Sequence, residues 1–102
     1  MPAPDPAALR EKAGRASELL KSMSSPHRLM VLCWLTQGER SVGELGGLIG
    51  LGQSALSQHL ARLRRDGLVK TRRDRQTIYY SLDGEASQRV MKTLYEIYCR
   101  DA

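Results

Sequence analysis

Residues 51–67 place an apolar stripe and a polar, basic face on opposite sides of one predicted helix. Leu56, Leu60 and Leu63 follow the i, i+4, i+7 spacing of an α-helix, so that side of the helix is expected to be buried. The opposite side of this helix lacks carboxylates and combines short polar side chains with arginines: Ser54, Ser57, Gln58, Ala61, Arg62 and Arg65. Glutamine and serine can bond to base edges, and small residues permit close approach. On its own, however, the pattern also fits an ordinary solvated surface helix.

The segment that follows favours DNA reading over the surface-helix interpretation. Gly67 can end the helix in a left-handed conformation. Residues 68–82 then predict two short strands, with Ile78, Tyr80 and Leu82 alternating inward on the second of them. The tip between the strands is expected to be basic and to consist of Arg73, Asp74, Arg75 and Gln76. A helix followed by a basic hairpin predicts a winged helix-turn-helix.

The net positive charge of the chain lies in the same region. The net charge is +5 at pH 7. Residues 59–75 hold seven Lys or Arg and two Asp, which accounts for the whole excess, because the remaining residues are balanced. A basic patch on the predicted reading helix and wing indicates a surface that binds phosphate.

Capping signals mark the helices that come before this region. Capping side chains indicate three helix starts. In two of them the capping residue is followed by proline, Asp5-Pro6 and Ser25-Pro26, and the third is the capping box Ser41-Val-Gly-Glu44. Gly50-Leu51-Gly52 is the expected turn of the helix-turn-helix, and a last helix is expected after Gly84. The fold class is therefore mainly α with a β-hairpin wing, in the order α-α-α-α-β-β-α. One domain is expected over residues 1–102, with residues 1–4 disordered.

The first and last predicted helices carry apolar stripes that could form a dimer interface. The stripes are Leu9, Ala13, Ala16, Leu19, Leu20 and Met23 on the first helix, and Ala86, Val90, Met91, Leu94, Ile97 and Tyr98 on the last. Packing within the chain and packing against a second copy both fit the first stripe. The two together exceed what so short a chain needs internally, so a homodimer is expected.

Two cysteines, Cys33 and Cys99, stand far apart in the sequence and without metal-type spacing. In a reducing compartment they could be inert buried thiols or a redox-responsive pair. Cys99 lies off the apolar stripe beside Arg100, so it is expected to be the more accessible thiol and to react first.

In its motifs the chain resembles the ArsR/SmtB family of winged-helix repressors. The matching segments are Ser25-Pro-His-Arg-Leu29, Ser41-Val-Gly-Glu-Leu45, Gln53-Ser-Ala-Leu-Ser-Gln-His-Leu60, Leu63-Arg-Arg-Asp-Gly-Leu-Val69 and Gln76-Thr-Ile-Tyr-Tyr-Ser-Leu82. The resemblance implies a homodimer that joins through its first and last helices. It also implies an inducer that lowers affinity for operator DNA.

Departures from the metal-sensing members of that family point to the thiols. Gly46-Gly47 stands where arsenic- and cadmium-type members carry cysteines, and the last helix has no histidine of the zinc and nickel type. A dedicated metal site of either kind, or any cofactor, is therefore not expected. The placing of Cys33 and Cys99 resembles the subgroup of BigR, SqrR and HlyU, which implies sensing of reactive sulfur species or oxidants. His59, flanking the leucine stripe, is expected to bond to the scaffold and not to a metal.

These observations predict a cytoplasmic transcriptional repressor that binds a pseudo-palindromic operator in double-stranded DNA as a homodimer. The residues expected at the DNA are Gln53, Ser54, Ser57, Gln58, Arg62, Arg65, Arg73, Arg75 and Gln76. Two alternatives remain open: a repressor that senses a thiophilic metal such as As(III) through the same thiols, and a module that binds an acidic protein with the basic face. An enzyme is not expected, because no paired carboxylates, activated nucleophile or phosphate loop can be recognised. No membrane association is expected, since no apolar run is long enough to span a bilayer and the N-terminus lacks signal-peptide features.

Overall fold

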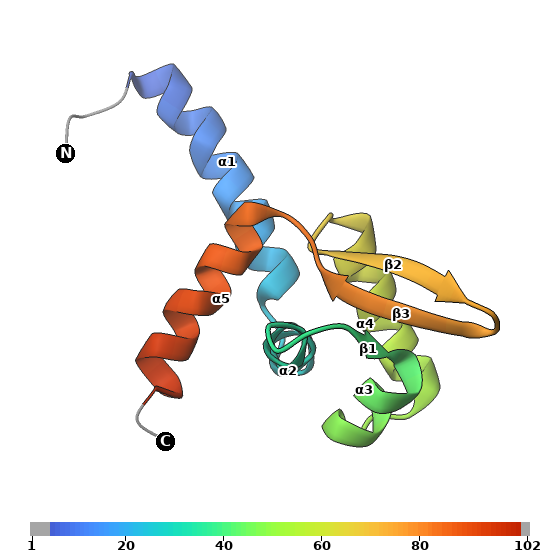
Figure 1. Cartoon of the computed structure of the whole chain (residues 1–102). Coiled ribbons are helices and arrows are strands. Elements are labelled where there is room, and N and C mark those ends of the chain that lie inside the picture. Colours follow the sequence, from blue (N-terminus) through green and yellow to red (C-terminus); the bar gives the residue numbers. More distant parts are fainter. Residues whose placement is uncertain (1–4, 101–102) are drawn as a thin grey trace.

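The computed structural model describes residues 5–100 and has the mainly helical, winged architecture predicted from the sequence (Figure 1). The helices and strands are α1 (Pro6–Met23), α2 (Pro26–Leu35), β1 (Arg40–Ser41), α3 (Val42–Ile49), α4 (Gln53–Arg65), β2 (Val69–Asp74), β3 (Thr77–Leu82) and α5 (Glu85–Tyr98). The expected disorder of residues 1–4 lies outside the described residues.

The predicted capping residues start their helices. The Asp5 carboxylate accepts a hydrogen bond from the amide of Ala8, and the Ser25 hydroxyl accepts one from the amide of Arg28. The capping box at α3 is complete, because Ser41 and Glu44 each accept from the backbone amide of the other at 3.1 Å. These bonds satisfy amide groups that have no partner inside a helix. The helix boundaries therefore follow from local sequence.

The hydrophobic core surrounds α2, which contacts all four other helices and β3. Val31, Leu32 and Leu35 of α2 are buried. The predicted leucine stripe of α4 meets them, and Leu45 of α3 and Met91 of α5 complete the same cluster. The stripe prediction is confirmed, since Leu56, Leu60 and Leu63 are each at most 1% exposed. Because this face of α4 is buried, the opposite face points toward solvent.

The sheet differs from the prediction in two respects. It has three strands in the order β1-β3-β2, because Arg40 and the helix cap Ser41 pair with Tyr80 and Tyr79 of β3. The hairpin turn is also tighter than predicted. Asp74 pairs with Thr77, so Arg73 and Asp74 belong to β2 and only Arg75 and Gln76 form the turn. Arg75 adopts the left-handed conformation with φ 60°.

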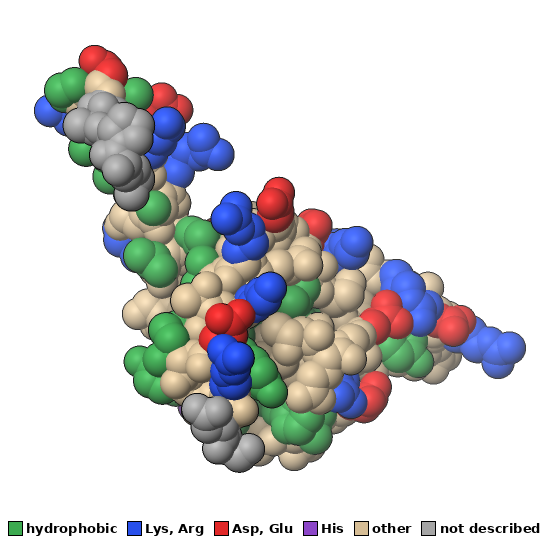
Figure 2. All heavy atoms as spheres, turned by 60° about the vertical axis from the view of Figure 1, so that its left-hand side comes forward, with side chains coloured by type: hydrophobic (Ala, Val, Ile, Leu, Met, Phe, Trp, Pro, Cys, Tyr) green, Lys and Arg blue, Asp and Glu red, His purple; other side chains and the backbone are tan. Residues whose placement is uncertain are grey.

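Helix α1 projects away from the body of the protein (Figures 1 and 2). The radius of gyration is 15.3 Å, whereas a compact domain of this length has about 13 Å. Large apolar side chains are exposed on this helix and on α5, with Leu20 at 57% and Ile97 at 64%. Figure 2 shows apolar side chains along the projecting helix and on the neighbouring body, and basic ones at the far end of the wing. The described chain leaves this apolar surface without a partner.

In residues 5–100, helices of sufficient length and hydrophobicity to cross a membrane are lacking.

Candidate nucleic-acid interface and thiol pocket

The outward face of α4 carries the side chains expected to read DNA. Gln53, Ser54, Ser57 and Gln58 are exposed along its N-terminal half. The helix lies beside the β2–β3 wing, which extends away from the body (Figure 1). This half of α4 has no charged side chain, so it can approach base edges without first breaking an ion pair. The end of the helix is different.

Both arginines expected at the DNA from the second half of α4 pair with one carboxylate. Arg62 Nε lies 3.1 Å from Asp66 Oδ2, and Arg65 Nε lies 3.3 Å from Asp66 Oδ1. The sequence prediction of a face without carboxylates therefore missed Asp66, although its i, i+4 spacing from Arg62 is a recognisable signal. Asp66 offsets part of the positive charge here and holds both guanidinium groups near the end of the helix.

A second ion pair braces the wing. Arg72 of β2 donates from Nε and Nη2 to the two carboxylate oxygens of Glu39 at 2.8 and 2.7 Å. The guanidinium carbon also lies 4.6 Å from the centre of the Tyr79 ring. The hydrogen bond from Arg72 holds the pKa of Glu39 below its ordinary value. Arg72 is thus committed to the scaffold, a role that the sequence did not reveal because Glu39 stands 33 residues away.

Three cations of the wing have no carboxylate partner among the described residues: Lys70, Arg73 and Arg75. All three side chains are exposed, as is Gln76 in the turn. The positive charge that the wing can offer to phosphate is therefore concentrated on these residues and not on Arg72.

His59 is held by the scaffold, as predicted. Its Nδ1 lies 3.3 Å from Arg28 Nη1, and the same guanidinium donates from Nε to the Ser22 carbonyl at 2.6 Å. The His27 ring lies 5.7 Å from the His59 ring, centre to centre. Burial, followed by the charges of Arg28 and His27, lowers the pKa of His59. Arg28 thereby links the end of α1 to α4.

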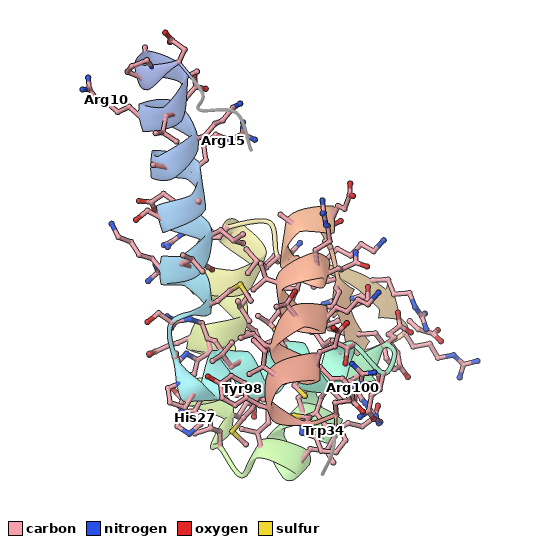
Figure 3. The ribbon with its side chains drawn as sticks, turned by 90° about the vertical axis from the view of Figure 1, so that its left-hand side faces the viewer. Arg10, Arg15, His27, Trp34, Tyr98 and Arg100 are labelled. Atoms are coloured by element: carbon pink, nitrogen blue, oxygen red, sulfur yellow. The ribbon has the colours of Figure 1, made fainter. Side chains whose placement is uncertain are left out.

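The two cysteines line one apolar pocket between α2 and α5. Both thiols are free, with Cys33 half-buried on α2 and Cys99 exposed at the end of α5. The pocket has a volume of about 250 Å³, and its walls include Leu29, Leu94 and Tyr98. Figure 3 views this side of the molecule, with Tyr98 on the last turn of α5 and Trp34 on α2. Two residues 66 positions apart in sequence thus share a cavity.

Within residues 5–100, His, Cys, Asp and Glu nowhere gather in a group of three or more that could hold a metal ion.

Comparison with known proteins assigns the family. Residues 25–71 match the bacterial regulatory proteins of the arsR family. The transcriptional activator HlyU of Vibrio cholerae is 46% identical over 92 residues, which cover 90% of this chain and 85% of that protein. The chain belongs to the ArsR family. The resemblance inferred from the motifs is confirmed, and the matched segment contains α2, α3 and α4.

Solved structures agree with this ArsR assignment over nearly the whole chain. Reduced HlyU from Vibrio cholerae superposes with a TM-score of 0.89 at 45% identity, covering 91% of this chain and 98% of that one. The transcriptional repressor BigR from Xylella fastidiosa gives a TM-score of 0.86 at 41% identity, covering 95% and 96%. This ArsR protein is therefore a winged-helix, DNA-binding transcriptional regulator, and its relatives are regulators rather than enzymes.

Proposed function

We propose that this ArsR protein is a cytoplasmic, homodimeric repressor that leaves its operator when Cys33 and Cys99 become linked by reactive sulfur species or oxidants. Residues 1–102 would form one domain that both binds DNA and dimerises. The observation that carries the proposal is the shared pocket, because Cys33 and Cys99 both line the same apolar cavity between α2 and α5. A bridge between them requires that the two residues face a common space.

The dimer would use the apolar surfaces of α1 and α5. Large exposed apolar side chains gather on α1, α2 and α5: Leu9, Leu20, Met30, Tyr95, Ile97 and Tyr98. A second copy that covers this surface around a two-fold axis would bring two α4 helices into one assembly. Such a pair fits a palindromic operator, in which half-sites about one helical turn apart mirror the two-fold axis.

Within each protomer, the residues of the DNA interface would divide by task. The exposed side chains of early α4, Gln53, Ser54, Ser57 and Gln58, would read base edges in the major groove. Arg73, Arg75 and Gln76 of the wing would contact the backbone. Arg62 and Arg65 would contribute less than isolated arginines, because Asp66 already pairs with both.

The relatives differ in the direction of regulation. HlyU is named an activator and BigR a repressor. We adopt repression, because an inducer that weakens operator binding then turns genes on. In vitro transcription from a promoter that carries the operator, with reduced and oxidised protein, separates the two directions.

Two alternatives make different predictions. A sensor of As(III) through the same thiols would bind the metal without forming a sulfur–sulfur bond. A module that uses the basic face for an acidic protein would bind DNA with salt dependence but without preference for one palindrome.

Intact mass spectrometry together with operator binding tests the switch. The operator is first selected from a random duplex library with the reduced protein. The protein is then treated with peroxide, with a persulfide or with arsenite, and its mass and operator affinity are measured. We expect an internal bridge, with or without added sulfur, and an affinity loss of about 5–150-fold, typical of allosteric coupling. Cys33→Ser and Cys99→Ser should bind normally when reduced and remain bound after treatment; release by both variants would exclude the thiol switch.

A further inference from the structure

Cys33 lies between two cavities, only one of which contains Cys99. The first is the apolar pocket described above, here called the thiol pocket. The second, here called the polar pocket, has a volume of about 370 Å³ and is lined by Cys33 together with Gln37, Gln88 and Lys92. Thr36, Met91 and Tyr95 border both cavities. The Cys33 thiol can therefore be approached from a side that Cys99 does not occupy.

Most of the wall of the polar pocket is apolar, with Leu82 and Met91 among its residues, but its few polar groups are complementary to the anionic end of a small organic molecule. Lys92 is the only charged side chain on its wall, and it has no carboxylate within 4.0 Å among the described residues. The carboxamides of Gln37 and Gln88 add hydrogen-bond donors and acceptors. An ammonium group with amide neighbours is suited to a carboxylate.

The size of the polar pocket narrows the choice of sulfur donor. Peroxide or inorganic persulfide has only a few atoms and needs no such space. The volume lies within the range of small-molecule sites, about 300–1,000 Å³. It therefore suits an organic donor with a sulfur end at Cys33 and an anionic end at Lys92.

We propose that the polar pocket docks a low-molecular-weight alkyl persulfide that carries a carboxylate, with the carboxylate at Lys92 and the outer sulfur at Cys33. This inference rests on the proposed thiol switch and adds to it a docking site, in which Lys92 selects donors that carry a carboxylate. The Cys33 thiolate attacks the outer sulfur, a new sulfur–sulfur bond forms, and the donor's own sulfur–sulfur bond breaks. The donor leaves as its thiolate, and Cys33 keeps the transferred sulfur with its proton.

The second step closes the bridge from the other cavity. The Cys99 thiolate attacks the sulfur of Cys33 that is bonded to its side chain, so a disulfide forms and hydrosulfide leaves. The persulfide is the oxidant of the whole sequence, the two cysteines are oxidised, and one thiol and one hydrosulfide are released. For this class of donor Cys33 reacts first, which reverses the order expected from the greater exposure of Cys99.

A pair of matched donors tests the polar pocket. The probes are the persulfides of N-acetylcysteine, which carries a carboxylate, and of N-acetylcysteine amide, which is neutral. Each is mixed with full-length Cys99→Ser protein, so the reaction stops after Cys33 gains one sulfur atom, and the rate is followed by intact mass spectrometry. The measured quantity is the ratio of the two rates, divided by the same ratio for a free thiol in solution, which removes the intrinsic reactivity of the donors.

Lys92→Gln in the same background should lower that ratio about fivefold, the factor expected for one ion pair in water. Lys92→Arg should retain it. Arg89→Gln removes an equal charge from an exposed position of α5 that is outside the polar pocket and only loosely paired, with Glu85 4.0 Å away. It should leave the ratio within twofold. An unchanged ratio in Lys92→Gln, or an equal loss in Arg89→Gln, would overturn the docking site.

Failure of the polar pocket and failure of the switch give different results. If the ratio does not depend on Lys92 but the protein with both cysteines still forms a bridge and leaves the operator, only the docking site is wrong. If Cys33 takes up sulfur with the expected dependence on Lys92 but the protein with both cysteines neither bridges nor releases DNA, the docking site stands and the proposed switch is wrong.

Discussion

Substitutions at Gln58, Arg75 and Arg72 separate base reading, phosphate binding and scaffold roles in the DNA interface. Gln58 lies exposed on the uncharged half of α4, and Arg75, in the turn of the wing, has no carboxylate partner among residues 5–100. Arg72 donates two hydrogen bonds to Glu39. If these environments decide function, Gln58→Ala, Arg75→Ala and Arg72→Ala should change operator binding in three different ways.

The expected magnitudes follow from one contact of each kind in each protomer. Gln58→Ala should cost roughly 1–3 kcal/mol for each base contact on the operator and little on random DNA. Each phosphate contact contributes about 0.9 to the slope of log affinity against log salt, so loss of Arg75 from both protomers of a dimer should make the slope shallower by about 1.8. Between about 50 and 200 mM salt, the affinity gap between Arg75→Ala and the unaltered protein should then narrow about 12-fold.

Arg72→Ala is the matched control for charge. It removes the same charge from the neighbouring strand, but Glu39 already offsets that charge, so the salt slope should change by much less than for Arg75→Ala. Fluorescence anisotropy on the selected operator and on a scrambled duplex, over a salt series, measures all three variants. Equal slope changes in Arg72→Ala and Arg75→Ala would refute the division of wing arginines, and equal losses on both duplexes in Gln58→Ala would refute its role as a reader.

Three further predictions address assembly and stability. Ile97→Glu should dissociate the proposed dimer, because this exposed side chain lies on the apolar surface, whereas Leu48→Glu on α3 should not; sedimentation velocity distinguishes them. Ser41→Ala should destabilise the fold by about 1 kcal/mol through loss of a helix cap, measured by urea unfolding. The pKa of His59 is lowered from 6.5 in the folded protein, so its contribution to stability is complete above about pH 6.5 and is lost as the pH falls towards the lower folded value. His59→Gln should flatten this acid dependence of the unfolding midpoint, and an unchanged profile would contradict it.

Local signals in the sequence predicted most of the helices. The Asp5, Ser25 and Ser41 caps act within three residues of the helix start, so their chemistry is readable without tertiary information. The leucine spacing of α4 likewise predicted which face is buried. Gly67 ends the turn after α4 with φ 80°, as expected from its freedom to adopt that conformation.

Features that depend on distant residues were missed. The two-residue strand β1 has no periodicity of its own and exists because Arg40 and Ser41 meet the free edge of β3. The ion pair of Arg72 with Glu39 likewise joins two residues that are 33 positions apart in the sequence. The placing of Cys33 and Cys99 at one pocket was implied only by family resemblance, since nothing in their spacing indicates that α5 returns to α2.

Helix α2 provides the physical connection that the proposed switch requires. It carries Cys33 at the thiol pocket and Arg28 near its own start. The Arg28 guanidinium donates a hydrogen bond to the carbonyl of Ser22 in α1 and lies within hydrogen-bond distance of His59 Nδ1 in α4. A bridge from Cys33 to Cys99 would tie the end of α5 to α2. Any resulting movement of α2 would be transmitted to both α1 and α4, because the Arg28 side chain makes hydrogen-bond contacts with both helices. α1 is a proposed interface helix and α4 the proposed reader, so a displacement of α2 would change the spacing of the two readers in the proposed dimer. Coupling by this route needs neither the wing nor the sheet to move, and it explains how thiols remote from the reading face could weaken operator binding.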